Sequence, residues 1–148
     1  MSWLSRLLHG RSAAPASATA STPARVTPEP PEHDADRAKA EADRLWESGQ
    51  LEAACEAYAS LLARHPSHAR AWNNYGLCLR QAGQFDAAHR AFVQATHHAP
   101  DLAAPWVNLA VSHEDNQAPT QALLSLDQAL RIDPGSRDAI NNLSLIHI

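Results

Sequence analysis

Asparagine recurs at a fixed interval in this chain, and its amide is well suited to recognising another polypeptide. Asn74, Asn108 and Asn142 are spaced 34 residues apart, and Asn73 and Asn141 directly precede two of them. An asparagine amide offers two N–H donors and one carbonyl acceptor, so it can pair with a peptide unit whatever side chain that unit carries. The row therefore predicts contact with the backbone of an extended peptide. The alternative is that each amide bonds a neighbouring repeat or water.

The nine histidines do not form a pattern expected of a metal site. His97 and His98 are adjacent, so on a helix their side chains point about 100° apart and do not share a face. His65 and His68 flank a proline in a predicted turn, and no cysteine or carboxylate recurs around them at ligand spacing. The sequence therefore predicts no metal site and no cofactor.

The remaining reactive residues do not predict an enzyme. Cys55 and Cys78 form no CxxC pair and fall within predicted helices, where we expect them to be small apolar residues in a reducing compartment. Nucleophile-elbow, phosphate-loop and dinucleotide-binding motifs are absent from the sequence. The carboxylates are scattered over positions expected to be exposed. We therefore expect neither catalysis nor a small-molecule substrate.

Several residue types share the interval of the asparagines, and this indicates an array of repeats. The recurring residues are Pro66, Pro100 and Pro134, and Ala54, Ala88 and Ala122. We place the repeats at 35–68, 69–102 and 103–136, with a partial fourth repeat at 137–148.

The second repeat shows why each unit is predicted to be a pair of helices. Apolar and small residues in 69–82 follow the i, i+3, i+4, i+7 spacing of one helical face: Trp72, Tyr75, Gly76 and Leu79. A second helix is predicted over 85–98, after Gly83, which favours a helix end. Small residues recur where the two helices of a pair approach each other: Gly76 with Ala88, Ala42 with Ala54, and Ala110 with Ala122.

This pattern resembles the tetratricopeptide repeat (TPR). The second repeat matches that motif most fully, and the third departs from it at Gln117 and Pro119, where glycine and an aromatic residue are usual. We therefore expect an altered hairpin turn in the third repeat. The first repeat has Ala38 and Glu41 in place of bulky residues and is expected to act as a polar cap.

The resemblance implies an all-α fold, a right-handed α-solenoid in which the first helix of each repeat lines a concave groove. The candidate peptide-binding residues are then Arg70, Asn73, Asn74, Leu77, Asn108, Val111, Asn141 and Asn142. Leu77 and Val111 would provide apolar sockets between the asparagines. The asparagine row is similar to the ladder in the TPR arrays of O-linked N-acetylglucosamine transferases, including their bacterial relatives.

Some TPR domains instead grip the carboxylate at the C-terminus of chaperones with a clamp of lysines, an arginine and asparagines. In this chain Ala104 and Asn108 occupy positions where that clamp places basic groups, and Asn74 alone fits. A chaperone-tail site is therefore not expected.

The bulk composition excludes some partners and divides the chain. The net charge of −4 argues against a nucleic-acid partner. Residues 12–33 are rich in Pro, Ala, Ser and Thr and are predicted to be a disordered linker. Residues 1–11 fit a short amphipathic helix. We expect the protein in the cytoplasm, and this helix makes peripheral contact with the inner membrane the alternative. No run is long enough to span a membrane.

The last residues, LSLIHI, correspond to one translation of a transposase end used as a sequencing adapter. The fourth repeat also stops within its first helix, so we expect the native protein to continue beyond about Asn142. The leading expectation for function is a scaffold that binds a peptide or partner protein in the groove. Two alternatives are the N-terminal TPR region of a larger glycosyl-, methyl- or sulfotransferase, and a membrane-tethered assembly factor.

Overall fold

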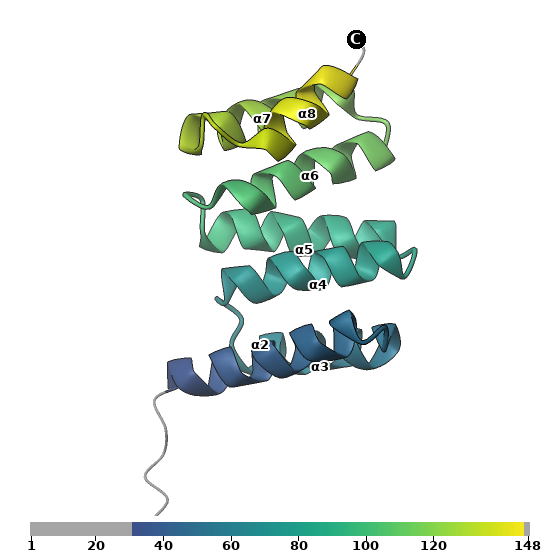
Figure 1. Cartoon of the computed structure of the whole chain (residues 1–148), viewed down its shortest axis with the longest axis vertical. Helices are drawn as coiled ribbons and strands as arrows, with labels where there is room; N and C mark the ends of the chain where they lie inside the picture. Colours follow the sequence, from purple (N-terminus) through teal and green to yellow (C-terminus); the bar gives the residue numbers. More distant parts are fainter. Residues whose placement is uncertain (1–30, 147–148) are drawn as a thin grey trace, which may run out of the picture.

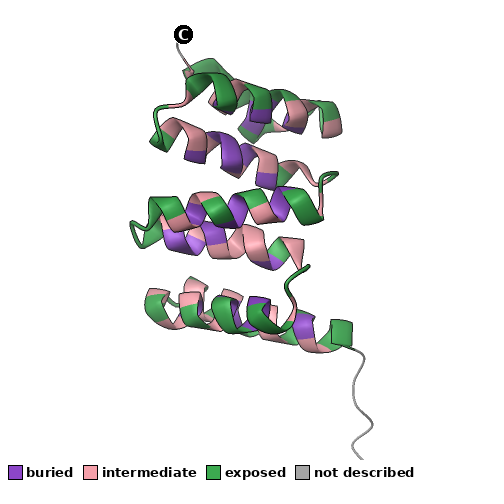
Figure 2. Ribbon diagram, turned by 180° about the vertical axis from the view of Figure 1, so that it is seen from behind, coloured by how far each residue is buried: buried purple, intermediate pink, exposed green. Residues whose placement is uncertain are grey.

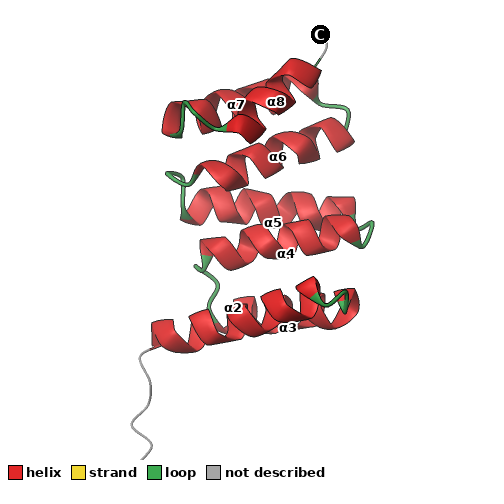
Figure 3. Ribbon diagram, viewed as in Figure 1, coloured by secondary structure: helices red, strands yellow, loops and turns green. Residues whose placement is uncertain are grey.

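The computed structural model describes residues 31–146, and this part of the chain is a stack of helices (Figure 1). No strand occurs among the described residues (Figure 3). The helices are α2 (Pro31–Glu47), α3 (Leu51–Arg64), α4 (Ala69–Gln81), α5 (Phe85–His98), α6 (Ala103–Asp115), α7 (Pro119–Ile132) and α8 (Arg137–Leu145). The all-α solenoid predicted from the sequence is confirmed.

The helices form consecutive antiparallel pairs, α2 with α3, α4 with α5, and α6 with α7, stacked along the long axis of the molecule (Figure 1). The first helices of the pairs also contact one another, because α2 touches α4, α4 touches α6, and α6 touches α8. The first helices therefore form one continuous surface, which is where the sequence places the candidate binding residues.

The core runs through the stack between neighbouring helices, and the buried residues lie on the sides that face them (Figure 2). The largest fully buried side chains are Tyr58, Phe92, Leu61 and Leu126. Alanines bury their whole surface at Ala42, Ala54, Ala122 and Ala129. Small residues at these positions allow the helices to approach closely, as expected from the sequence.

The three hairpin turns have one backbone conformation, and the altered turn expected in the third repeat is wrong. Gly49 and Gly83 adopt φ values of 80° and 78°, and Gln117 adopts the same left-handed region with φ 56°. The residue after each of them donates its N–H to a helix carbonyl five residues back, with N···O distances of 2.8–2.9 Å. Glutamine accepts a strained conformation here because the packing of the repeats fixes the turn.

The tryptophans that begin the second and third repeats hold the turns between repeats. The indole N–H of Trp72 donates to the carbonyl oxygen of Pro66 at 2.8 Å, and Trp106 donates to Pro100 at 3.0 Å. The two bonds are equivalent in consecutive repeats. This explains why tryptophan and proline recur together at the same interval.

The N-terminal part of the chain is described only from Pro31. Helix α2 begins at Pro31, inside the stretch 12–33 that the sequence assigns to a linker, because proline is tolerated in the first turn of a helix. The predicted amphipathic helix at 1–11 and the linker up to residue 30 lie outside the described residues. Within 31–146, no helix has the length and apolar character needed to cross a membrane.

Candidate functional site

The candidate residues all lie on the first helices of their repeats. We use the name binding face for the surface formed by these residues and by the side chains on α2, α4, α6 and α8 that contact them. Helix α4 carries Arg70, Asn73, Asn74 and Leu77, α6 carries Asn108 and Val111, and α8 carries Asn141 and Asn142. Arg70 and Asn141 are exposed, and the other six are half-buried. Side chains of intermediate exposure can contact a ligand while their own orientation is held by neighbours.

The asparagines on α4 and α6 are bonded across the boundaries between repeats. The Asn74 amide donates from Nδ2 to Oδ1 of Asp43 on α2 at 3.0 Å. The Asn108 amide donates from Nδ2 to Oδ1 of Asn73 on α4 at 2.8 Å. The Asn74 amide also interacts with the Tyr58 hydroxyl, so its carbonyl oxygen is the atom not used in these contacts, whereas Asn73 uses its carbonyl oxygen and not its N–H groups. Both bonds go to a neighbouring repeat, as the alternative interpretation of the asparagine row predicts for these amide groups, and they fix the direction of the amides.

Asp43 is the centre of the polar contacts on the first two repeats. Its carboxylate accepts hydrogen bonds from Lys39 Nζ at 2.6 Å, from the Tyr58 hydroxyl, and from Asn74. Burial of Asp43 opposes ionisation, but the three hydrogen bonds outweigh burial and lower the pKa of this carboxyl. Burial and the bond to Asp43 raise the pKa of Tyr58, which is therefore a fixed donor.

A second set of polar bonds joins the C-terminal ends of the first helices. The Trp46 indole N–H donates to Oε1 of Gln81 at 2.7 Å. Arg80 donates two bonds to the carboxylate of Asp115, at 2.7 and 3.2 Å. The hydrogen bonds to the Asp115 carboxylate raise the pKa of Arg80, so the guanidinium stays charged. These bonds tie α2 to α4 and α4 to α6 at the edge of the binding face.

A hollow of about 450 Å³ opens beside Leu77, next to the second set of polar bonds. It is lined by Trp46, Leu77, Arg80, Gln81 and Phe85. Phe85 is 47% exposed although it is a large apolar residue. The combination of two aromatic rings, an aliphatic side chain and a guanidinium suits an apolar or aromatic side chain of a ligand.

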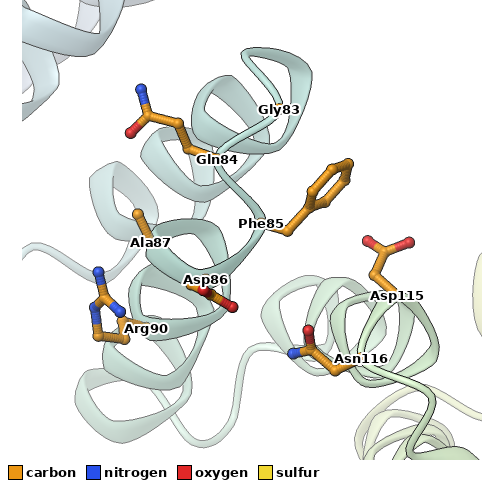
Figure 4. Close-up of a pocket in the computed structure, with 8 residues that line it drawn as sticks. All are labelled: Gly83, Gln84, Phe85, Asp86, Ala87, Arg90, Asp115 and Asn116. Atoms are coloured by element: carbon orange, nitrogen blue, oxygen red, sulfur yellow. The ribbon is translucent and has the colours of Figure 1, made fainter.

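A neighbouring hollow of about 580 Å³ lies where the start of α5 faces the end of α6 (Figure 4). Phe85, Asp86 and Arg90 come from α5, and Asp115 and Asn116 come from the end of α6. The Phe85 ring extends from the start of α5 toward the end of α6 in this view (Figure 4). Phe85 thus lines both hollows and joins them at the edge of the binding face.

The sequence placed the asparagines and Leu77 on this face, as the structure does, but it missed several side chains that contact them there. Asp43 occupies the ninth position of its repeat, which is also the position of Leu77 and Val111, so its place on this face was available from the alignment of the repeats. Trp46 and Arg80 share the twelfth position in the same way. The spacing gave no sign, however, that their partners would lie 35 residues away.

The described part of the chain contains no group of three or more His, Cys, Asp or Glu side chains arranged to hold a metal ion. His65 contacts the Asp34 carboxylate at 3.1 Å, and His68 accepts the N–H of Ala71 at the start of α4. The rings of His97 and His98 meet edge to face with centroids 5.1 Å apart. The first two histidines thus have structural roles at the turn between the first and second repeats.

Comparison with known proteins identifies the architecture. The family model described as tetratricopeptide repeat matches residues 39–88 and 79–137. A search of curated proteins found no match. Among solved structures, the first TPR of Spaghetti (RPAP3), bound to the HSP90 peptide SRMEEVD, is 16% identical with a TM-score of 0.73, over 77% of this chain and 90% of that one.

Two further structures have the same fold. YrrB, a TPR protein with an unusual peptide-binding site, is 23% identical with a TM-score of 0.69, over 75% of this chain and 57% of that one. The TPR2B domain of yeast Sti1, in a complex with Hsp70, is 21% identical with a TM-score of 0.70, over 76% of this chain and 94% of that one. At these identities the likeness concerns the fold.

Proposed function

Because two matches to its family model together span residues 39–137, the chain belongs to the tetratricopeptide repeat family, and we propose that it is a scaffold that binds an extended peptide or partner protein across α4 and α6. The observation that carries the proposal is the row of oriented amides beside the hollow at Leu77. The function proposed is binding and not catalysis.

The two parts of the binding face suit different parts of a ligand. The asparagine amides have the donors and acceptors of a peptide unit and would hold the ligand backbone without regard to its sequence. The hollow lined by Trp46, Leu77 and Phe85 would take one apolar or aromatic side chain and so set the sequence preference. Exposed aromatic residues of this kind are enriched at the centre of protein interfaces.

The fold neighbours support a polypeptide ligand but not a particular one. The first TPR of Spaghetti is bound to an acidic HSP90 peptide. In this chain Ala104 and Asn108 stand where a chaperone-tail clamp has basic groups, so we do not extend that ligand to it. We propose that the chain binds an internal segment of its ligand through backbone contacts and one apolar side chain. The terminal carboxylate of the ligand is not needed in this mode of binding.

A matched pair of substitutions tests this function. Peptides selected from a random library displayed on phage would first be measured by calorimetric titration against the unmodified chain. Val111→Lys puts a charge on the binding face, whereas Val93→Lys makes the same exchange on the exposed side of α5. We expect the first variant to weaken binding at least about tenfold and the second to leave it nearly unchanged.

A second measurement separates backbone contacts from side-chain contacts. Replacing peptide bonds of the selected ligand one at a time with N-methyl amides removes a backbone donor and leaves the side chains in place. We expect affinity to fall at some bonds, because the Asn74 and Asn108 carbonyl oxygens would lose a donor. Equal loss from Val111→Lys and Val93→Lys would contradict binding at this face, and no effect of N-methylation at any bond would contradict recognition of the ligand backbone.

A further inference from the structure

The two cysteines of the chain meet at the boundary between the first and second repeats. Cys55 on α3 and Cys78 on α4 have their sulfur atoms 2.8 Å apart. A disulfide bond has a length of about 2.05 Å, so the sulfurs need only a small further approach to become bonded. The residues are far apart in sequence and lie on helices of different repeats, so the fold creates this contact. The proposed binding function makes no use of it.

The surroundings of the two thiols differ. Cys78 is fully buried, in a cluster with Ala42, Ala54 and Tyr58, while Cys55 is half-buried and packs against the same cluster. Burial and the contact with Cys55 raise the pKa of the Cys78 thiol to about 12. A reagent in solution therefore reaches the pair through Cys55, and Cys78 is placed to react with whatever forms there.

We propose that Cys55 and Cys78 are a reversible disulfide site that covalently joins the first repeat to the second. The oxidant is a low-molecular-weight disulfide such as oxidised glutathione. The Cys55 thiolate attacks one glutathione sulfur, the S–S bond of glutathione breaks, and the first glutathione thiolate leaves. The Cys78 sulfur then attacks Cys55 Sγ, and the second glutathione leaves. The two cysteine protons pass to the two released glutathiones. Overall, two protein thiols and one glutathione disulfide become one protein disulfide and two glutathione thiols.

The bond would act on the position of α3 against α4, close to the binding face. Tyr58, in the same cluster as Cys78, donates to the Asp43 carboxylate, and Asp43 accepts from Asn74. A covalent link between α3 and α4 therefore lies directly behind the first cross-repeat bond of that face. It would hold the first two repeats together independently of the turn at 65–68.

The sequence allows a direct chemical test on the full chain. The protein is equilibrated without denaturant in buffers of oxidised and reduced glutathione, thiols are trapped with an alkylating reagent, and the chain is cut with trypsin. Cleavage after Arg44, Arg64, Arg70 and Arg80 puts Cys55 in fragment 45–64 and Cys78 in fragment 71–80. We expect the two fragments to appear joined, at a mass lower by two hydrogen atoms than their sum.

Thermal unfolding supplies the second readout. A cross-link that fits the native fold restricts the unfolded chain, so we expect the oxidised protein to melt roughly 10 °C higher than the reduced protein, and the gain to disappear on adding dithiothreitol. Cys55→Ser, which changes the less buried of the two cysteines, should lose both the joined fragments and the redox-dependent part of the melting temperature. Its melting temperature need not equal that of the reduced protein, because only the difference between redox states is compared.

Three outcomes would overturn the proposal. The joined fragments could form only after denaturant is added, the cross-link could join two separate chains, or the cross-linked protein could melt no higher than the reduced one. Each would mean that the native packing of α3 on α4 does not accommodate the bond. None of them bears on peptide binding at Val111 and Leu77, which is measured separately in the reduced protein.

Discussion

Gly76 lies directly against the ring of Phe92, and a Cβ atom built on Gly76 would come within 2.5–2.9 Å of three ring atoms. The contact joins the two helices of the second repeat, and Phe92 is fully buried. The equivalent positions of the third repeat are Ala110 and Leu126. The third repeat thus combines a larger residue on the first helix with a smaller one on the second, whereas the first repeat combines Ala42 with Tyr58, so the close approach of Gly76 to Phe92 belongs to the second repeat.

Gly76→Ala should destabilise the protein, although alanine is the better helix former. The added methyl group meets an aromatic ring that is enclosed on all sides, so we expect a loss of about 1–3 kcal/mol in the free energy of unfolding, measured in urea. Phe92→Leu in the same chain should recover part of that loss, because it recreates the Ala110 and Leu126 pair. A double variant that loses as much as the two single variants summed would contradict the direct contact.

Gln117→Gly should stabilise the third hairpin turn. Gln117 has a positive φ that glycine adopts without the steric cost of a side chain, so we expect a gain of about 1 kcal/mol in the free energy of unfolding. The reciprocal variant Gly83→Gln, at the equivalent turn of the second repeat, should lose a similar amount. No atom lies within 4 Å of a Cβ built on Gly83, so that loss would come from the backbone alone. Opposite signs for the two variants are the expected result.

Asp43→Asn should weaken the boundary between the first two repeats. The carboxylate accepts from Lys39, Tyr58 and Asn74, and the amide would lose the charge that strengthens these bonds. We expect a loss of about 1–2 kcal/mol at neutral pH, measured by thermal unfolding. The control is Asp127→Asn, which removes an exposed carboxylate paired with Arg131 four residues away and should cost little.

The Asp43 carboxyl also makes the stability of the protein depend on pH in the acidic range. The pKa of Asp43 is lower in the folded protein than in the unfolded chain, so its stabilisation is complete above the unfolded pKa and is lost as the pH falls through the folded pKa. The melting temperature of the unmodified protein should therefore fall more steeply below about pH 4 than that of Asp43→Asn. Parallel curves would show that Asp43 is not held as a carboxylate by its partners.

His113 predicts a second pH dependence, at milder acidity. Burial and the nearby His89, whose ring centroid is 4.9 Å away, lower the pKa of His113. The Ser112 hydroxyl is bonded to His89 in the same contact between α5 and α6. Because the unfolded chain takes up a proton more readily than the folded one, stability should decrease as the pH falls below about 6.5.

His113→Gln should remove that decrease between pH 8 and pH 5.5, as followed by urea unfolding at each pH. The exposed His97, near the C-terminal end of α5, provides the matched control, since His97→Gln should leave the pH dependence in place. Loss of the dependence in the control variant alone would assign it to the helix end.

The repeat period predicted the fold because each interval carries a complete set of local signals. Gly49 and Gly83 end the first helices, and Pro66 and Pro100 follow the second ones, so the helices could be placed from the sequence. Gln117 shows the limit of this reasoning. Residue type indicates what a turn prefers, whereas packing of the neighbouring helices decides which turn forms.

The sequence predicted which helices carry the candidate residues, but it did not predict the hydrogen bonds that these residues make. The first-helix positions of Asn74 and Asn108 follow from the period, but their partners depend on how one repeat is rotated against the next. Asp43 and Asn73 are brought to them by that rotation, which no local pattern encodes. The meeting of Cys55 with Cys78 has the same origin, since it depends on the packing of α3 against α4.

The cross-repeat bonds also give the binding face a direction. Asn73 bonds Asn108, and Arg80 bonds Asp115, each 35 residues away, although the repeat has 34. These two partners therefore lie one residue further along the next helix than the equivalent position, a rise of about 1.5 Å. The bond between Asn74 and Asp43 spans 31 residues and does not share this offset. A row of side chains with this offset is inclined to the helix axes and does not cross them at right angles. If the proposed peptide binds along this row, a peptide laid in one direction and the same peptide laid in reverse would meet different contacts.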